Sequence, residues 1–188
     1  MKILIIDNLD SFTYNIKHYI EQFAEQVYVM RIDELDYRKI LEYDKIVISP
    51  GPGLPSEKPE LGHLVNNFQT AKPILGICLG HQAIAEYYGA KLENKEKVDH
   101  GVSKPTHIIN NDIIFSEIDK DFFSGRYHSW VVKQETIPDE IIVTAVDDDG
   151  KIMAFKHKNL NVRGVQFHPE SILTPQGLKI IENWVKLS

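Results

Sequence analysis

The chain has 188 residues, of which 43% are hydrophobic and 26% are charged, as expected for a globular domain with a full core. Its formal net charge of −6 argues against a nucleic-acid partner or an anionic membrane surface, and no apolar run is long enough to span a bilayer. The single cysteine, Cys78, cannot form an internal disulfide, which is typical of a cytoplasmic protein. We expect one domain over residues 1–188.

The first half of the chain alternates predicted strands and helices. Short apolar runs are followed by segments in which apolar residues recur every three to four positions. The predicted elements are the strand Lys2–Ile6, a helix from about Ser11, the strand Val27–Arg31, the helix Tyr37–Tyr43, the strand Lys45–Ser49, the helix Glu60–Thr70, the strand Pro73–Ile77 and a helix from about His81 to Gly89. Strands joined through helices pair in parallel, with helices on both faces of the sheet.

The second half has the alternation of antiparallel strands. An Asp-Gly pair between two apolar runs predicts a hairpin, and a proline opens a C-terminal amphipathic helix. The predicted elements are the hairpin strands Ile141–Val146 and Lys151–His157, the last strand Val162–Phe167, and a helix from Pro175 with the core stripe Leu178, Ile181 and Val185. The expected fold is therefore α/β, with a mixed, mostly parallel central sheet and helices on both faces.

Cys78 lies where the strand Pro73–Ile77 meets the following helix. Glycines stand two residues before it and two residues after it, at Gly76 and Gly80, where Cβ atoms would collide in a sharp strand-turn-helix elbow. The helix N-terminus favours a thiolate through its partial positive charge, and the N–H of Leu79 would face an oxyanion. A lone cysteine is more often a small buried hydrophobe, but the two glycines favour a nucleophile.

A base for this thiol is expected at the end of the last strand. His168-Pro169-Glu170 follows Val162–Phe167 directly, and the proline keeps the segment extended, so the histidine and the glutamate project to the same side. They would complete a nucleophile–base–orienter set at the carboxyl edge of the sheet. Taken alone, the pair could instead lie on a solvated turn. A metal site is disfavoured, because no second histidine or cysteine stands nearby at ligand spacing.

A rival base stands three residues after the nucleophile. His81 shares the predicted helix with Cys78, and that placement restricts the approach of its ring to the sulfur. We therefore rank His81 behind His168 as the base.

Five short motifs occur in a fixed order along the chain. They are Asp7–Asn15 (DNLDSFTYN), Ser49–Gly53 (SPGPG), Gly76–Gln82 (GICLGHQ), Arg126–Ser129 (RYHS) and Gln166–Ser171 (QFHPES). In this combination they are highly specific, and they extend over essentially the whole chain. The chain resembles the class I, triad-type glutamine amidotransferases, in particular the branch that holds the small subunits of anthranilate synthase and aminodeoxychorismate synthase.

The resemblance implies a role for each motif residue. Cys78 would attack the side-chain amide of L-glutamine, form a γ-glutamyl thioester and release ammonia, with His168 as base and then acid, held by Glu170. One oxyanion donor would be the N–H of Leu79, and a glycine of the SPGPG motif would supply the second, because proline has no N–H. The implied substrate-binding residues are Gly51, Pro52, Gly53, Leu79, Gln82, Ser129 and Trp130. Without the resemblance, Gln82 would be interpreted as a surface amide and Trp130 as a core aromatic.

The resemblance also implies a partner that consumes the ammonia. A domain of this size has no room for a second active site, so a chorismate-binding synthase subunit is expected, as component I of anthranilate synthase in tryptophan biosynthesis. The same chemistry would suit aminodeoxychorismate synthase in folate biosynthesis, or one subunit could serve both enzymes. Less favoured alternatives are a stand-alone cysteine hydrolase and a non-catalytic binding subunit. No cofactor is expected in this chain, and Mg²⁺ is expected only in the synthase partner.

One stretch departs from the family pattern. Relatives often carry His-Gly-Lys near the middle of the chain, where this sequence has His100-Gly101-Val102. The loss of that lysine cannot stop triad chemistry, but it weakens any inference about how this loop communicates with a partner.

Overall fold

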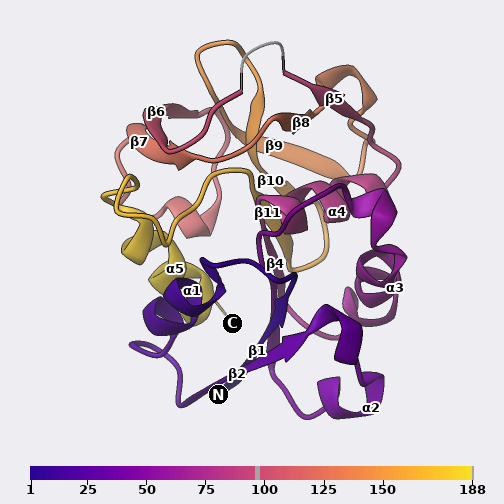
Figure 1. The fold of residues 1–188 in the computed structure, drawn as a ribbon. Helices are drawn as coiled ribbons and strands as arrows, with labels where there is room; N and C mark the ends of the chain where they lie inside the picture. Colours follow the sequence, from indigo (N-terminus) through magenta and orange to yellow (C-terminus); the bar gives the residue numbers. More distant parts are fainter. Residues whose placement is uncertain (96–97, 188) are drawn as a thin grey trace.

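The computed structural model describes residues 1–95 and 98–187 and is built around a mixed sheet (Figure 1). The nine strands of this sheet are, in spatial order, β2 (Gln26–Arg31), β1 (Lys2–Asp7), β3 (Lys45–Ile48), β4 (Ile74–Ile77), β11 (Val162–Val165), β10 (Ile152–His157), β9 (Ile141–Val146), β6 (Val102–Ile108) and β7 (Asp121–Arg126). A second, two-stranded sheet pairs β5 (Leu92–Asn94) with β8 (Trp130–Val132).

The pairing of the strands confirms the expected mixed architecture. The strands from β2 to β11 in this order pair in parallel, and the strands from β11 to β7 pair antiparallel. The arrowheads of β1 and β4 point towards the antiparallel half, so the carboxyl ends of the parallel strands face it (Figure 1). This edge is where open α/β sheets bind ligands.

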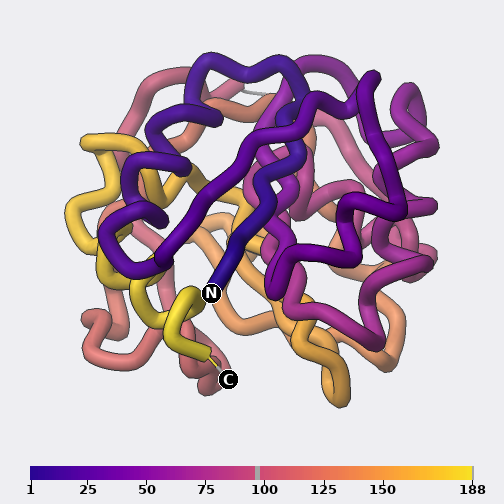
Figure 2. The backbone as a smooth tube through the Cα atoms, turned by 90° about the horizontal axis from the view of Figure 1, so that it is seen from below, coloured from indigo at the N-terminus to yellow at the C-terminus, as the bar shows by residue number. Residues whose placement is uncertain are grey.

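Helices cover both faces of the parallel strands, as the sequence predicts. The helices are α1 (Thr13–Ile20), α2 (Tyr37–Ile40), α3 (Pro59–Phe68), α4 (Leu79–Tyr87) and α5 (Gly177–Lys186), and single 3₁₀ turns lie at Ile32–Glu34, Pro55–Glu57, Ile113–Phe115 and Gln134–Thr136. α1 and α5 lie side by side in both backbone views (Figures 1 and 2), and they pack on the face opposite to α3 and α4. Within the described ranges, none of these helices has the length and apolar character needed to cross a bilayer.

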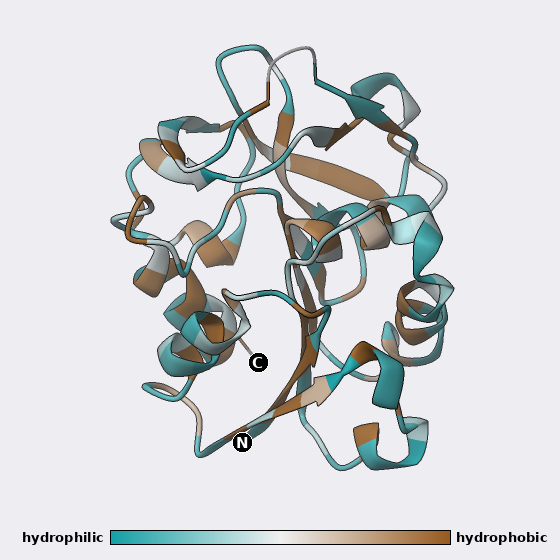
Figure 3. Ribbon diagram, in the orientation of Figure 1, coloured by the Kyte–Doolittle hydropathy of each residue, from teal (hydrophilic) through white to brown (hydrophobic). Residues whose placement is uncertain are grey.

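Strand β1 shows how the sheet is buried on both faces. Its residues alternate between two apolar clusters: Ile3 and Ile5 join the cluster that contains α1 and α5, while Leu4 and Ile6 join the one that contains α3 and α4. All four side chains are fully buried. Apolar residues accordingly follow the central strands, and polar residues cover the outer faces of the helices (Figure 3). A parallel strand buried on both faces needs such a continuous apolar run.

Four expectations about the helices need correction. Two concern helix ends, because α2 stops at Ile40 and not at Tyr43, and α5 starts at Gly177 and not at Pro175. The core stripe of α5 consists of Ile180, Ile181, Trp184 and Val185, whereas Leu178 is only half-buried. Trp184 has the largest fully buried side chain, and the helix face is turned to bring it against the sheet. In addition, α4 begins at Leu79, immediately after the nucleophile, rather than near residue 81.

The predicted hairpin forms, but the other strands of the antiparallel half were not predicted one by one. β9 and β10 pair across a turn closed by the N–H of Gly150, which donates to the carbonyl of Asp147 at 3.0 Å. β6 was missed because Pro105 interrupts it, and proline is unusual inside a paired strand. β5 and β8 have only three residues each, too few for a clear alternation.

The elbow at Cys78 depends on close backbone contacts at its two glycines. A Cβ atom on Gly76 would lie 2.4 Å from the carbonyl of Gly80, and a Cβ on Gly80 would lie 2.3 Å from the carbonyl oxygen of Ile48 in β3. Cys78 itself has φ 51° and ψ −101°, which an L-residue rarely adopts, and its N–H donates to Val165 at 2.8 Å. Strand pairing and glycine packing together hold the nucleophile in this strained conformation.

A Gly80→Ala substitution should destabilise the protein by about 1–3 kcal/mol or more, because the added methyl group forces α4 away from β3. Gly62→Ala is the matched control, since it also changes a helical glycine but places its Cβ in open space. The control should be neutral or stabilising by about 0.5–1 kcal/mol. Urea unfolding measures both free energies; equal values for the two variants would contradict the role given to Gly80.

Candidate active site

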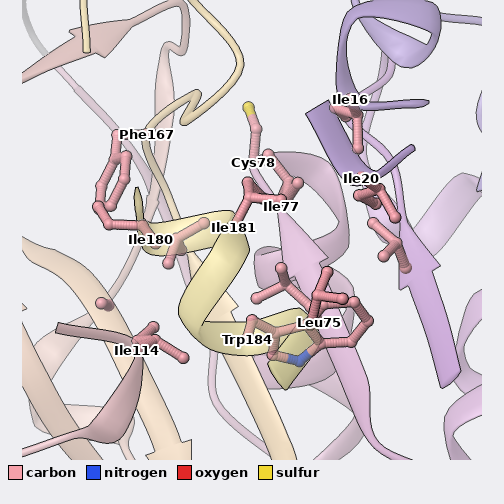
Figure 4. Close-up of a cluster of buried hydrophobic side chains, with 14 of the residues drawn as sticks. Ile16, Ile20, Leu75, Ile77, Cys78, Ile114, Phe167, Ile180, Ile181 and Trp184 are labelled. Atoms are coloured by element: carbon pink, nitrogen blue, oxygen red, sulfur yellow. The ribbon is translucent and has the colours of Figure 1, made fainter. Parts of the chain in front are cut away.

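Cys78 opens into a cavity at the carboxyl edge of the parallel strands. Its sulfur points away from the apolar cluster of Leu75, Ile77 and Trp184 (Figure 4). The cavity has a volume of about 190 Å³ and is lined by Gly51, Pro52, Gly53, Cys78, Leu79, Gln82, Tyr127, His128, Ser129 and Trp130. All seven residues predicted to bind substrate therefore lie around the predicted nucleophile, although they come from three distant segments of the chain.

Larger hollows elsewhere on the described surface do not contain the nucleophile. The largest, about 650 Å³, is lined by residues 108–113, 115, 116, 118 and 120, and another of about 570 Å³ adjoins Trp130 from the side of α4 and β5. Volume alone would favour these hollows, but the smaller cavity brings Cys78 together with the predicted binding residues. The chemistry of the lining therefore identifies the candidate site.

His168 and Glu170 form a buried pair beside the nucleophile. The Nδ1 of His168 lies 2.7 Å from Oε1 of Glu170, and both residues are at most 3% exposed. The rings of Phe12 and Tyr127 pack against the imidazole, with centroids 5.1 and 4.8 Å away. These contacts restrict the orientation of the ring, and the carboxylate lies where the predicted orienter is expected.

The electrostatic environment favours the protonated form of this imidazole. Burial alone would lower its pKa, but the nearby thiolate charge of Cys78 and the carboxylate of Glu170 outweigh burial and raise the pKa of His168 well above its ordinary value. No described group makes a well-aligned hydrogen bond to its Nε2. The charges of Cys78 and Glu170 therefore favour the imidazolium form of His168 over the neutral form.

His81, the rival base, lies in the core and not at the thiol. It is fully buried, its ring packs 4.6 Å from that of Phe155, and neither ring nitrogen has a hydrogen-bond partner in the described structure. Burial lowers the pKa of His81 to about 3, so the ring stays neutral. The ranking of His168 ahead of His81 agrees with this placement.

The Gly51–Gly53 loop packs closely against the nucleophile's helix, because Gly51 has no side chain. A Cβ atom on Gly51 would lie 2.5 Å from Cβ of Asn8 and 3.0 Å from the side chain of Leu79. Asn8 is itself anchored, because its Nδ2 donates to the carbonyl of Ser49 at 2.9 Å. The first N–H groups of a helix have no intrahelical partner, so the N–H of Leu79 is available to an oxyanion.

Gln166, for which no role was predicted, reaches the nucleophile. Its Nε2 donates to the sulfur of Cys78 at 3.6 Å, and its Oε1 accepts from Nε2 of Gln82 at 3.1 Å. Gln82 also donates to the carbonyl of Trp130 at 2.9 Å. A signal was present, because strand alternation places residues 166 and 168 on the same side of the chain.

His128 is a second residue that the sequence analysis left without a role. It lines the cavity but is 5% exposed, and neither of its ring nitrogens has a hydrogen-bond partner among the described residues. Burial and the positive charges of Arg126 and Lys95 lower the pKa of His128 to about 2. The neutral ring of His128 therefore forms part of the cavity wall near His168.

The departing stretch His100-Gly101-Val102 lies next to this wall. The ring of His100 approaches that of Tyr127 edge-on at 5.9 Å, and the N–H of Gly101 donates to the carbonyl of Arg126 at 2.9 Å. Because Tyr127 packs on His168, only the side chain of Tyr127 lies between this loop and the His168–Glu170 pair. No group of three or more histidine, cysteine or acidic residues within residues 1–95 and 98–187 is arranged to hold a metal ion.

The pKa of His168 should fall in Cys78→Ser, because the thiolate charge that supports the imidazolium is lost while burial remains. Glu170→Gln should lower the pKa of His168 too, since an amide carries no charge. Titration of the His168 ring resonances by NMR measures both shifts. An unchanged titration midpoint in Cys78→Ser would contradict the coupling of ring and sulfur.

Comparison with known proteins agrees with this geometry. The family model described as glutamine amidotransferase class-I matches residues 4–187. Anthranilate synthase component 2 of Pseudomonas putida is 43% identical over 194 residues, covering 99% of this chain and 97% of the relative. Aminodeoxychorismate/anthranilate synthase component 2 of Bacillus subtilis is 40% identical over 188 residues, covering 98% and 95%.

A solved structure shares the fold. The crystal structure of a protein from Thermoplasma acidophilum, described as part of a GMP synthase, superposes with a TM-score of 0.88 at 24% identity, covering 98% of this chain and 92% of that chain. At this identity the likeness concerns the fold alone. The full-length match of the family model, together with relatives at 40–43% identity, places the chain among the class-I glutamine amidotransferases, and it belongs to that family.

Proposed function

We propose that this chain is the glutaminase subunit of anthranilate synthase, which hydrolyses L-glutamine and delivers ammonia to a chorismate-binding synthase subunit. One observation carries the proposal: Cys78 stands on a strained elbow in a cavity of about 190 Å³, with the buried His168–Glu170 pair beside it. The names of full-length relatives at 40–43% identity support the choice of synthase.

The proposed reaction uses the three groups in turn. The thiolate of Cys78 adds to the side-chain amide carbon of glutamine, and the carbonyl oxygen becomes an oxyanion. His168 gives its proton to the amide nitrogen, the C–N bond breaks, and ammonia leaves a γ-glutamyl thioester. His168, now neutral, takes a proton from water, which attacks the thioester and releases glutamate and the thiolate. Glu170 holds the imidazole in one orientation throughout.

The remaining lining residues would bind glutamine and its oxyanion. The N–H of Leu79 and one glycine N–H of the Gly51–Gly53 loop are the proposed oxyanion donors. Gln82, Ser129 and Trp130 lie on the wall that would hold the polar end of glutamine. Thiolate, imidazole and these donors make up a complete amide-cleaving set, so we propose no cofactor for this chain and assign Mg²⁺ to the synthase partner alone.

The partner is proposed to dock over the mouth of the cavity. Near it, the segment Asp10–Tyr14 follows the exposed Leu9, and Ile172 stands two residues after Glu170 with 91% of its surface exposed. Phe12 in this segment contacts the His168 ring, so a partner seated there would touch the catalytic pair through one side chain. Exposed apolar side chains such as Leu9 and Ile172 suit contact with a protein surface that receives ammonia directly. The reactive thiol suits the reducing cytoplasm, where we place the complex.

A second candidate partner has a specific observation in its favour. The Bacillus subtilis relative is named for both aminodeoxychorismate synthase and anthranilate synthase. The acceptor chemistry belongs to the partner, so the same glutaminase site would serve either enzyme, or both. Purification of the chain with its bound partners, followed by mass spectrometry, distinguishes these three cases.

Cys78→Ser should abolish glutamine-dependent anthranilate synthesis by the complex and leave synthesis from added ammonium salt nearly unchanged. Only amide cleavage requires the thiolate, whereas ammonia can enter the partner's site from solution. The two rates are compared in the same preparation by anthranilate fluorescence. If both rates fell equally, Cys78 would be a structural residue and the proposed division of labour would be wrong.

The isolated chain should hydrolyse glutamine slowly, and addition of the synthase subunit with chorismate should raise the rate severalfold or more. We expect the oxyanion loop or the Trp130 region to be misaligned until the partner docks, and Gly53, with φ +81°, allows a peptide in the loop to flip without a Cβ clash. Steady-state ammonia release measures both rates. Full activity of the isolated chain, unchanged by synthase and chorismate, would favour a free-standing hydrolase.

A further inference from the structure

Gln166 joins the nucleophile to the substrate-binding wall. It follows β11, whose residue Val165 pairs with Ile77, so its backbone lies beside Cys78. The side chain is fully buried, and its backbone N–H donates to the carbonyl of Met153 at 2.9 Å. A buried amide needs partners for both its oxygen and its nitrogen, and Gln166 finds them in Gln82 and in the sulfur of Cys78.

The carbonyl of Trp130, which can only accept a hydrogen bond, determines how the side-chain amides of Gln82 and Gln166 are oriented. The carbonyl of Trp130 requires a donor, so Gln82 must present its nitrogen there. The second N–H of that nitrogen reaches the oxygen of Gln166 at 3.1 Å. The nitrogen of Gln166 is then left to face Cys78, and it donates to the sulfur at 3.6 Å. The polarity of the whole series is therefore set at Trp130.

We propose that Gln166 is a positioning residue, which donates a hydrogen bond to the Cys78 thiolate and links its orientation to the Trp130 carbonyl through Gln82. The sulfur then has the amide N–H of Gln166 as its hydrogen-bond donor and interacts with the charge of the nearby His168 ring, so its orientation is restricted. Movement of the Ser129–Trp130 segment breaks the hydrogen bond to Gln82. The side chains of Gln82 and Gln166 can then reorient, and the sulfur loses its amide donor. Glutamine or a docked partner on that wall thereby acts on the nucleophile.

This inference rests on the proposed glutaminase chemistry, but its test does not require glutamine. Cys78 is the only cysteine, so alkylation by iodoacetamide reports this sulfur alone. In Gln166→Met, which keeps a similar volume but removes the donor, alkylation at neutral pH should slow severalfold, and its pH profile should move to higher pH because the thiolate has lost a donor.

Kinetics provide the second readout. Glutaminase kcat should fall about tenfold to a hundredfold in Gln166→Met, the value of one hydrogen bond to a charged group, while KM stays within about threefold. Gln82→Met should shift the alkylation profile in the same direction but by less. The nitrogen of Gln166 can still donate to the sulfur, and only the hydrogen bond from Gln82 to the oxygen of Gln166 is lost. Gln69→Met is the matched control: its amide also bonds partly buried groups, the hydroxyls of Tyr87 and Tyr88, but lies away from the cavity. It should leave both readouts unchanged.

The outcomes separate this inference from the proposed function. An alkylation profile of Gln166→Met that superposes on that of the wild type, with kcat intact, overturns the role of Gln166. If Gln166→Met does not fold, the alkylation profile of Gln82→Met decides in its place. An unshifted profile in that variant would overturn the inference. Persistent glutaminase activity in Cys78→Ser would instead contradict the proposed chemistry, and the alkylation profiles would still test the contact between Gln166 and the sulfur.

Discussion

The active site depends on how closely α4 can approach β3 and β4. Gly76 lies against the backbone of Gly80, and Gly80 lies against the carbonyl of Ile48, so the chain turns from strand to helix within one residue. That residue is Cys78, and the turn places its sulfur at the carboxyl edge of the sheet and at the N-terminus of a helix. The strained backbone at Cys78 is sustained because the glycine contacts and the strand pairing around it leave no other conformation.

Three histidines show how burial and charge together decide a protonation state. His81 and His128 are buried without hydrogen-bond partners among the described residues, so their pKa values fall and both rings are neutral. His168 is buried to a similar extent, but the charges of Cys78 and Glu170 outweigh the cost of burial and raise its pKa. His168 therefore differs from His81 and His128 in the negative partners within its reach, and not in its degree of burial.

The two halves of the sheet make different contributions to the site. The parallel half supplies Cys78 and the Gly51–Gly53 loop at the ends of buried strands, where rigid elements hold both. The opposite wall runs from the end of β7, in the antiparallel half, to the start of β8, in the two-stranded sheet, and carries Tyr127 to Trp130. Hydrogen bonds through Gln82 and Gln166 connect the carbonyl of Trp130 on this wall with the sulfur of Cys78.

The sequence by itself determined the parts of this protein that depend on local spacing. Continuous apolar runs specified the parallel strands, and the two glycines around Cys78 specified the elbow. The pairing of His168 with Glu170 was also predicted, but the expected extended segment is wrong: Pro169 and Glu170 lie in a turn in which the N–H of Ser171 donates to the carbonyl of His168 at 3.2 Å. The tertiary structure alone decided which groups meet across the chain. It turned Trp184 rather than Leu178 into the core, put His81 against Phe155 and away from the sulfur, and brought Gln166 to the nucleophile. Contacts of this kind depend on the packing of elements distant in sequence, and periodicity within one element carries no information about its neighbours in space.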